Sequence, residues 1–478
     1  MNRRDALTTA PCWRTARETA RLIAARELSP ADVLHATLAR LRATEPHVNA
    51  FVTVLDAAGQ RDATRLAAQQ AAGAQLGPLH GVPVSVKDLI AVGGAPFTSG
   101  SRALEHNIVT ADAAAVERLR AAGAIIIGKT TTSEFGCKAV GDSPLTGSTR
   151  NPWDTAMTAG GSSAGAAASV AAGVTAVAVG TDGGGSIRIP AALCGLFGVK
   201  AQFGRVPVFP VAATPTLAHI CPIGRDVRDV ALLLAVLSGF DARDPHSVHD
   251  RVPDYVAACE RDPRPLRIAW SPTFGYATPE PEVRAIVEQA VQTFAAIGCT
   301  IEEVAAPFGD DPAEIWSAEF YAGVGTRLAT TLREQRKLLD PEVAAIVEHA
   351  LALPAEQYHQ AIVGRYALRE RMRKLFERYD LLLSPTLPVA SVAVGVSVPP
   401  GLAGRNLVSW VSYTYPFNLT GQPAASIPAG FTSKDLPVGL QLVARAYGEA
   451  DLFAAASAFE AARPWAQRRP PQLAQIPS

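Results

Sequence analysis

Residues 160–188 read GGSSAGAAASVAAGVTAVAVGTDGGGSIR, and this segment carries the most information about the fold class. It contains two glycine-rich turns, each with serine. Between the turns, residues 164–172 predict a helix of small side chains, and residues 174–179 predict a short apolar strand. Glycine in such turns lets backbone N–H groups approach a small reacting centre closely. The segment therefore predicts a helix–strand unit with polar chemistry at both of its turns.

Short strands and helices alternate around this unit. Apolar runs at 81–87 and 124–127 predict strands, and residues 113–122 between them predict a helix. Residues 187–193 predict another helix. This alternation is typical of a mainly parallel sheet that helices cover on both faces. We therefore expect an α/β fold.

The flanking regions extend this pattern. Residues 1–75 are helical in pattern, residues 79–245 hold the strand–helix alternation, and residues 246–478 combine a helical substrate region with C-terminal strands. A late pair of strands is predicted at 425–430 and 438–443. No repeat, low-complexity tract or persuasive linker divides the sequence. We therefore expect a single domain made of all 478 residues.

The composition limits the classes of partner. The chain has a formal net charge of +0, with 48% hydrophobic and 18% charged residues, and it has no basic stripe. Nucleic acid is therefore a poor candidate partner. The longest apolar run, residues 164–180, is short and rich in Ala and Gly, which favours a buried core over a membrane span.

The six cysteines show neither a CxxC pair nor a Cys/His spacing typical of metal ligands. No apolar segment follows the basic residues near Met1, so a secretory signal is not expected. We therefore expect reduced thiols in a cytoplasmic protein that needs no metal and no cofactor. The oligomeric state stays open, with a homodimer among the alternatives.

Residues 123–130, GAIIIGKT, match the phosphate-binding pattern G-x-x-x-x-G-K-[ST]. A phosphate-binding loop lies between a strand and a helix, but here the segment before residue 123 predicts a helix. The four middle residues, one Ala and three Ile, predict a strand themselves. We interpret the segment as a buried strand that ends in a turn at Gly128, and not as a nucleotide site.

Ser186 is the candidate nucleophile, because it follows three glycines and precedes a predicted helix. The backbone N–H groups of this loop can point into one small volume, and they belong to Gly183, Gly184, Gly185 and Ser186. Such a volume is an oxyanion hole, which holds the negative oxygen formed during acyl transfer. By itself, a serine in front of a helix is equally typical of a helix N-cap.

Lys87 is the candidate base, because no histidine lies in or near these turns. A lysine can accept a proton only when it is neutral, and burial among apolar neighbours lowers its pKa. Ser162 could then pass a proton between Lys87 and Ser186. Alone, Lys87 would be interpreted as a surface charge and residues 160–163 as a flexible turn. Their occurrence together favours a catalytic site.

Three further residues are candidates for a supporting role. Ser163 is expected to form a hydrogen bond near Lys87. Asp182 and Arg188 flank the glycine loop, and two roles stay open for them. They either fix the loop by an ion pair and backbone contacts, or they form a purely structural salt bridge.

These motifs resemble the amidase signature family. The resemblance is dense over residues 79–245 and looser over nearly the whole chain. Residues 154–200 are similar to the signature itself, and residues 418–423 (NLTGQP) and 436–442 (LPVGLQL) are similar to the family's C-terminal blocks. Several long motifs in the right order make this resemblance specific.

The resemblance implies a Ser–cis-Ser–Lys triad, with Ser186 as nucleophile, Ser162 as bridging serine and Lys87 as general base. It implies a cis peptide bond between Gly161 and Ser162. It also implies one α/β/α domain around a large, twisted mixed sheet covered by helices. The implied activity is that of an amidase, which converts a carboxylic amide to a carboxylate and ammonia or an amine through an acyl-enzyme.

The sequence departs from the family pattern at three positions. Ala159 stands where proline is frequent, Ala164 where a glycine is usual, and Gly183 where a larger residue is usual. None of these departures removes a reacting group. The glycine at position 183 either loosens the oxyanion loop or leaves more room for the acyl group.

Two other functions stay open. One is the glutaminase subunit of a tRNA-dependent amidotransferase, although members of that group carry Gln where this chain has Ile189. The other is a non-catalytic binding protein on the same fold. Substrate choice is expected to depend on residues 310–370 and on loops near 135–145 and 410–418. The expected substrate is a small amide, but aliphatic, aryl, peptide-terminal and urea-type amides all stay open.

Overall fold

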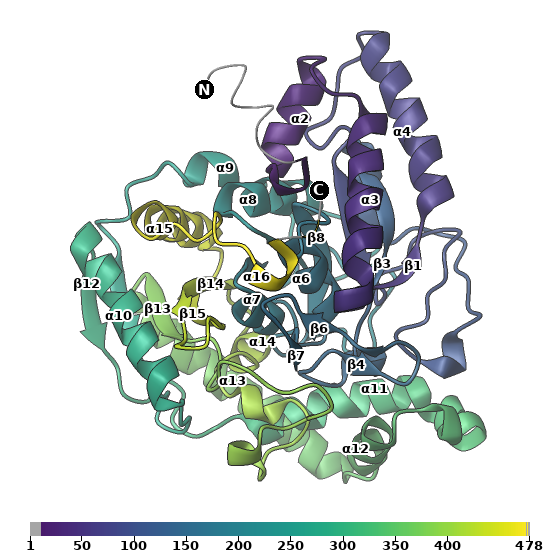
Figure 1. Ribbon diagram of the computed structural model, residues 1–478. Helices are drawn as coiled ribbons and strands as arrows, with labels where there is room; N and C mark the ends of the chain where they lie inside the picture. Colours follow the sequence, from purple (N-terminus) through teal and green to yellow (C-terminus); the bar gives the residue numbers. More distant parts are fainter. Residues whose placement is uncertain (1–10, 475, 477–478) are drawn as a thin grey trace.

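Residues 11–474 and residue 476 are described by a computed structural model, shown in Figure 1. Strands of this part of the chain form one eleven-stranded sheet, in the order β1-β3-β2-β8-β10-β9-β14-β15-β13-β11-β12. Helices cover the sheet, which confirms the expected α/β fold with a large mixed sheet (Figure 1). The strands of the sheet are β1 Phe51–Val54, β2 Pro83–Lys87, β3 Ile125–Thr130, β8 Val177–Asp182, β9 Phe197–Lys200, β10 His219–Gly224, β11 Arg267–Trp270, β12 Thr300–Glu303, β13 Leu381–Pro385, β14 Ala424–Phe431 and β15 Pro437–Ala444.

The helices form layers on the two faces of the sheet. The core of the first face is shared with α2 Ala16–Ala24, α5 Ala114–Ala121, α8 Val227–Leu237, α9 Tyr255–Ala258, α10 Pro281–Ile297 and α15 Glu449–Ala462. The cores of the second face are shared with α3 Pro30–Val48, α4 Asp56–Ala71, α6 Ala164–Ala171, α7 Arg188–Cys194, α11 Ala313–Gln335, α12 Pro341–Leu351, α13 Ala355–Arg378 and α14 Pro416–Thr420. Further elements are two small ribbons, β4 Asp142–Ser143 with β5 Gly147–Ser148 and β6 Arg150–Asn151 with β7 Asp154–Thr158, the helix α16 Pro471–Ala474, and short 3-10 helices.

The apolar run at the start of β3 shows why these strands lie in the middle of the layers. Ile126 belongs to the core of the first face, whereas Ile125 and Ile127 belong to a core of the second face. Successive side chains of a strand point to opposite faces, so a strand covered on both sides must be apolar at every position. Residues 125–130 of the GAIIIGKT segment therefore form the buried strand β3, and the segment does not form a phosphate-binding loop.

The predicted turn at Gly128 is wrong, because β3 continues through this residue to Thr130. The edge strand β1 pairs with β3 here, and a Cβ atom at position 128 would lie 2.6 Å from the carbonyl oxygen of Thr53. Glycine at this position therefore permits the close approach of two strands. It does not mark the end of one.

The expectation of a mainly parallel sheet is also wrong. β2 pairs in parallel with β3 and β8, and β11 pairs in parallel with β12 and β13, but the central strands are antiparallel. The predicted late pair, β14 and β15, is an antiparallel hairpin. Antiparallel neighbours need no crossover helix, and the segments that join β9 to β10 and β14 to β15 contain none.

The N-terminal region contributes to the sheet as well as to its covering. Helices α2, α3 and α4 gather at one end of the molecule, and α10 lies beside β12 at the other (Figure 1). The sequence predicted only helices before residue 75, but β1 also forms there and pairs with β3. None of the helices in the described chain is long and apolar enough to cross a lipid bilayer.

Candidate active site

The ends of two neighbouring strands bring the candidate residues together. β2 and β8 pair in parallel, so Lys87 at the end of β2 and Asp182 at the end of β8 lie at the same edge of the sheet. The turn before α6 carries Ser162 and Ser163 to this edge, where both contact Lys87. Ser186 lies in the loop between β8 and α7.

Lys87 is fully buried and lies among hydroxyl groups. Its Nζ is 2.7 Å from Ser162 Oγ, 2.9 Å from Ser163 Oγ and 2.9 Å from Thr181 Oγ1. Burial lowers the pKa of Lys87 well below its usual value, and the charge of Asp182 offsets only part of this effect. The site therefore disfavours the charged ammonium form of Lys87. Thr181 was not among the predicted residues.

The hydroxyl hydrogens around Lys87 are not equivalent. Ser163 Oγ donates to the carbonyl oxygen of Thr181, at 3.1 Å, and so it accepts from Lys87. A neutral lysine has two N–H donors and one lone pair. With three hydroxyls around Nζ, one of them must donate to it when the amine is neutral. Ser162 and Thr181 keep the hydrogens that can do so.

The two serine turns are joined through the backbone. The N–H of Ser163 donates to the carbonyl oxygen of Ser186, at 3.2 Å. The peptide bond between Gly161 and Ser162 is cis, as the family resemblance implies. Helix α7 begins at Arg188, and Ile187 precedes it without a side-chain cap, so Ser186 is not an N-cap. Proton transfer from Ser186 to Ser162 stays a prediction.

The oxyanion loop differs from the expectation at one residue. The N–H of Gly185 donates to Asp182 Oδ1, at 2.8 Å, so this group is engaged inside the protein and the expectation for Gly185 is wrong. Gly185 has a φ of 128°, a conformation that favours glycine. Its hydrogen bond to Asp182 closes a turn within the loop. Within the described chain, no acceptor takes the N–H of Gly183, Gly184 or Ser186.

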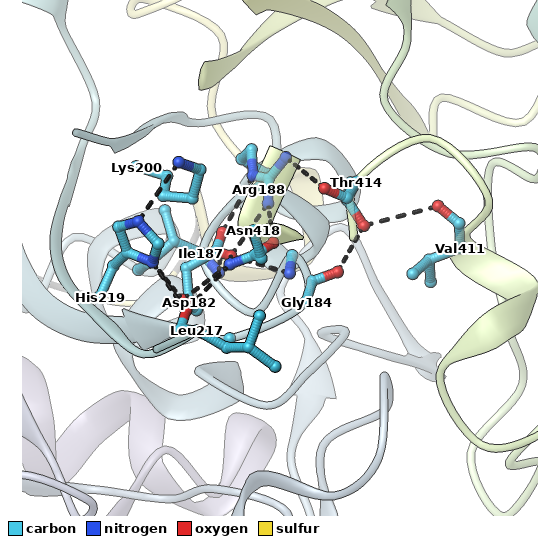
Figure 2. A network of polar contacts seen from close by, with 12 residues as sticks. Asp182, Gly184, Ile187, Arg188, Lys200, Leu217, His219, Val411, Thr414 and Asn418 are labelled. Atoms are coloured by element: carbon cyan, nitrogen blue, oxygen red, sulfur yellow. Dashed lines mark hydrogen bonds and ion pairs between the residues drawn. The ribbon is translucent and has the colours of Figure 1, made fainter. Parts of the chain in front are cut away.

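Asp182 and Arg188 form a fully buried ion pair at the base of this loop (Figure 2). Arg188 Nη2 and Nε bind the two carboxylate oxygens of Asp182 at 2.9 and 3.0 Å. Burial alone would raise the pKa of Asp182, but Arg188 and Asn418 outweigh it and hold that pKa below its usual value. Asp182 also accepts from the N–H of Gly185, so this ion pair is joined directly to the glycine loop.

The ion pair reaches the C-terminal strands through residues that sequence reasoning did not single out. Arg188 Nη1 donates to Gln441 Oε1 and to the carbonyl oxygen of Thr414, both at 2.8 Å. Asn418 Nδ2 donates to Asp182 Oδ1, at 2.9 Å. Asn418 and Gln441 lie in the two C-terminal blocks that resemble the family, which was the only sequence signal for them.

A second buried pair, Lys200 and His219, lies beside Asp182 (Figure 2). His219 Nδ1 lies 2.8 Å from the carbonyl oxygen of Leu217, and therefore carries the proton, which leaves Nε2 to accept from Lys200 at 3.4 Å. Burial lowers the pKa of Lys200 to about 7 and lowers the pKa of His219 well below its usual value. His219 Nδ1 also lies 3.2 Å from the carbonyl oxygen of Asp182, so the pair contacts the start of the loop through His219.

Each of the three regions expected to determine substrate specificity contacts the candidate site. Helix α11 brings Trp316 and Phe320 against the glycine loop, and the 410–418 segment brings Thr414 there. In the loop near 135–145, a Cβ atom at Gly136 would lie 3.2 Å from Ser162 Oγ. Over the residues that the structure describes, no group of three or more His, Cys, Asp or Glu side chains could hold a metal ion.

Known proteins resemble this chain over nearly its whole length. Residues 32–453 match the family model described as Amidase. The chain is 39% identical over 464 residues to an acylamidase of Rhodococcus erythropolis, which covers 96% of this chain and 97% of that protein. It is 36% identical over 482 residues to one of the subunits of the glutamyl-tRNA(Gln) amidotransferase of Moorella thermoacetica, with 95% and 98% covered. The solved structure of a bacterial aryl acylamidase of the amidase signature family has a TM-score of 0.91 at 30% identity, with 97% of this chain and 98% of that chain covered.

The fold and these similarities place the protein among the hydrolases. The chain belongs to the amidase signature family.

Proposed function

We propose that this protein is an amidase that converts carboxylic amides to a carboxylate and ammonia or an amine. The observation that carries this proposal is the position of Lys87, fully buried and 2.7 Å from Ser162 Oγ. A buried lysine that lies among neutral hydroxyls favours the uncharged amine, which is the form that accepts a proton. In the proposed mechanism, Lys87 is the general base, Ser162 the bridging serine and Ser186 the nucleophile.

Acylation begins when Ser186 gives its proton to Ser162, which passes its own proton to Lys87. The Ser186 oxygen attacks the amide carbon and forms a tetrahedral intermediate. The N–H groups of Gly183, Gly184 and Ser186 hold its oxyanion, and a well-placed donor of this kind is worth about 3–4 kcal/mol. Lys87 then returns the proton through Ser162 to the leaving nitrogen, and the C–N bond breaks.

Deacylation uses the same groups. A water molecule attacks the acyl-enzyme while its proton passes through Ser162 to Lys87. The second tetrahedral intermediate collapses, the bond between the acyl carbon and Ser186 breaks, and the proton returns to Ser186. The products are the free enzyme and the carboxylic acid, which gives its proton to solvent and becomes the carboxylate. Esters are expected to react by the same route, because the acylation chemistry is the same.

N-acylated amines are the first substrates that we propose. The similarity to an acylamidase and to an aryl acylamidase supports this class.

The test is the hydrolysis of an amide panel by wild type, Ser186→Ala and Lys87→Ala. The panel contains an N-acyl arylamine, an aliphatic primary amide, a peptide amide and glutamine. Ser169→Ala is a matched control, because Ser169 is a buried serine of α6 that pairs with Ser85 and not with Lys87. We expect hydrolysis to fall by more than about 1000-fold in both site variants and to persist in the control. Wild-type rates in either site variant would refute the triad.

A tRNA-dependent glutaminase is the second candidate, favoured by the similarity to one of the subunits of an amidotransferase. Against it, the position where the glutaminase subunits carry Gln holds Ile189, which is buried in an apolar cluster. Glutamine in the panel separates the two candidates. Glutamine as the preferred substrate, with rates that rise when the other amidotransferase subunits are added, would favour the glutaminase.

A further inference from the structure

Each peptide group of the oxyanion loop is held by its carbonyl oxygen. The donors come from different parts of the chain. They are Asn418 Nδ2 to the Asp182 carbonyl oxygen at 3.0 Å, Trp316 Nε1 to that of Gly183 at 2.8 Å, Thr414 Oγ1 to that of Gly184 at 2.7 Å, and the Ile189 N–H to that of Gly185 at 2.7 Å. The loop therefore owes its orientation to groups outside it.

The direction of each carbonyl fixes the direction of the next N–H. In a trans peptide group the C=O and the N–H point to opposite sides of the chain. The hydrogen bond from Trp316 to the Gly183 carbonyl therefore turns the Gly184 N–H to the opposite side. That N–H is one of the three that have no acceptor in the described chain. Trp316 thus determines the direction of the Gly184 N–H, one of the three free donors of the loop.

Trp316 differs from the other donors in its origin. The 410–420 segment supplies Asn418 and Thr414, and α7 supplies Ile189, whereas Trp316 belongs to the long helix α11. Its ring is fully buried and stacks on Phe320, with ring centroids 4.5 Å apart and an interplanar angle of 20°.

The two rings occupy the space that side chains of the loop would need. A Cβ atom at position 184 would lie 2.6 Å from Trp316 Cζ2, and one at position 183 would lie 3.0 Å from Phe320 Cε2. The glycine at position 183, where the family usually has a larger residue, is thus matched by an aromatic ring from α11. The ring restores the packing that the missing side chain would supply.

We propose that Trp316 is a positioning residue for the oxyanion hole, which it serves by orienting the Gly183–Gly184 peptide group. Phe320 stacks on the indole ring, so α11 supplies both the donor to the Gly183 carbonyl oxygen and the ring that packs against that donor. This inference rests on the proposed function, because it assigns a partner to the same oxyanion hole.

The test compares Trp316→Phe with Trp270→Phe. Phenylalanine keeps an aromatic ring against Phe320 but removes the N–H donor. Trp270 is a buried tryptophan of β11, far from β8 in the strand order of the sheet, and it controls for lost packing. We expect kcat on an N-acyl arylamine to fall by about 10- to 100-fold in Trp316→Phe, with KM within about threefold of wild type. Trp270→Phe is expected to keep kcat while losing thermal stability.

A second readout does not depend on an amide substrate. The rate at which an alkyl fluorophosphonate labels Ser186 also depends on the oxyanion donors, so it should fall in Trp316→Phe by a similar factor. If wild type is labelled but hydrolyses no amide, the proposed function fails while this rate still tests the role of Trp316. Unchanged kcat and labelling in Trp316→Phe would overturn the inference. The inference would also be overturned if the losses of kcat and of labelling rate in Trp316→Phe only matched the loss of folded protein, or if Trp270→Phe showed the same losses. A wild type that is neither labelled nor active would overturn both proposals.

Discussion

The lowered pKa of Lys87 depends on how the nearby Asp182 carboxylate is paired. Asp182 is the nearby carboxylate that would keep a lysine protonated, but both of its oxygens bind Arg188. The direct partners of Lys87 are neutral hydroxyls, which can donate to or accept from its amine. The ion pair between Asp182 and Arg188 therefore leaves burial as the main influence on Lys87.

The pH profile of the proposed reaction follows from this arrangement. A general base works only when it is unprotonated, so kcat/KM should fall as the pH drops through the pKa of Lys87. Because burial lowers that pKa, the acid limb should lie well below the usual lysine value of 10.5. Initial rates measured across the pH range in buffers of constant ionic strength check this. An acid limb close to the ordinary lysine value would contradict the assignment.

At the scale of elements, the start of α8 connects two other helices through acidic side chains. Asp229 is buried and accepts hydrogen bonds from the first N–H groups of α2. Glu460 of α15 accepts from the N–H of Val227, at 3.3 Å. Asp226 caps α8 by accepting from the N–H of Asp229 at 2.8 Å, which brings three carboxyl groups close together. Their protonation therefore affects how three helices pack.

This cluster predicts stability that decreases at alkaline pH. Burial, assisted by the charge of Asp226, raises the pKa of Asp229 to about 7 and that of Glu460 to about 8. Both values lie above those of an unfolded chain, so the folded state binds more protons and its stability falls as the pH rises through them. Relative to a variant without the Glu460 carboxyl, we expect the Tm of wild type to fall by roughly 2–4 °C between about pH 6 and about pH 9, whereas Lys87 and Lys200, whose pKa values burial lowers, affect both proteins alike.

Calorimetric scans of wild type and Glu460→Gln at several pH values measure this effect. Glutamine keeps the shape of the side chain but cannot ionise, so the variant should lose the contribution of Glu460 to the change of Tm with pH. The same dependence of Tm on pH in wild type and in Glu460→Gln would show that the cluster does not contribute to the pH dependence of stability.

At the scale of the whole molecule, the sequence predicted the class of fold and the residues around Lys87. It predicted the strand pairing and the contacts of the glycine loop less well. The apolar runs predicted β3 and β8, and the glycine-rich turns predicted that Ser162 and Ser163 lie near Lys87. These signals are local, or they belong to motifs that resemble a family. The antiparallel centre of the sheet was missed, because periodicity shows that a strand is buried but not which strand it pairs with.

The contacts of the glycine loop were missed for a related reason. Trp316 and Asn418 lie more than a hundred residues from the loop, and only the placement of α11 and of the 410–420 segment brings them to it. Three glycines also indicate free N–H groups without showing which way each one points. The engagement of the Gly185 N–H by Asp182 depends on side-chain geometry that spacing does not encode.

The order of strands supports the proposal that all 478 residues fold as one domain. β1, from the N-terminal region, pairs with β3, and β15 lies between β14 and β13 in the same sheet. We expect thermal unfolding to be one cooperative transition, with the same midpoint by far-UV circular dichroism and by tryptophan fluorescence. Two separate midpoints would instead indicate regions that unfold independently.

The two edge strands of the sheet, β1 and β12, affect whether molecules associate in concentrated solution. β12 is only four residues long and carries the exposed acidic residues Glu302 and Glu303, whereas β1 is equally short and has a shift in its register with β3. Short, charged or irregular edges resist pairing with a strand of another molecule. The sheet is therefore poorly suited to extend from one copy to the next, and fibrous aggregation along its edges is disfavoured despite its size.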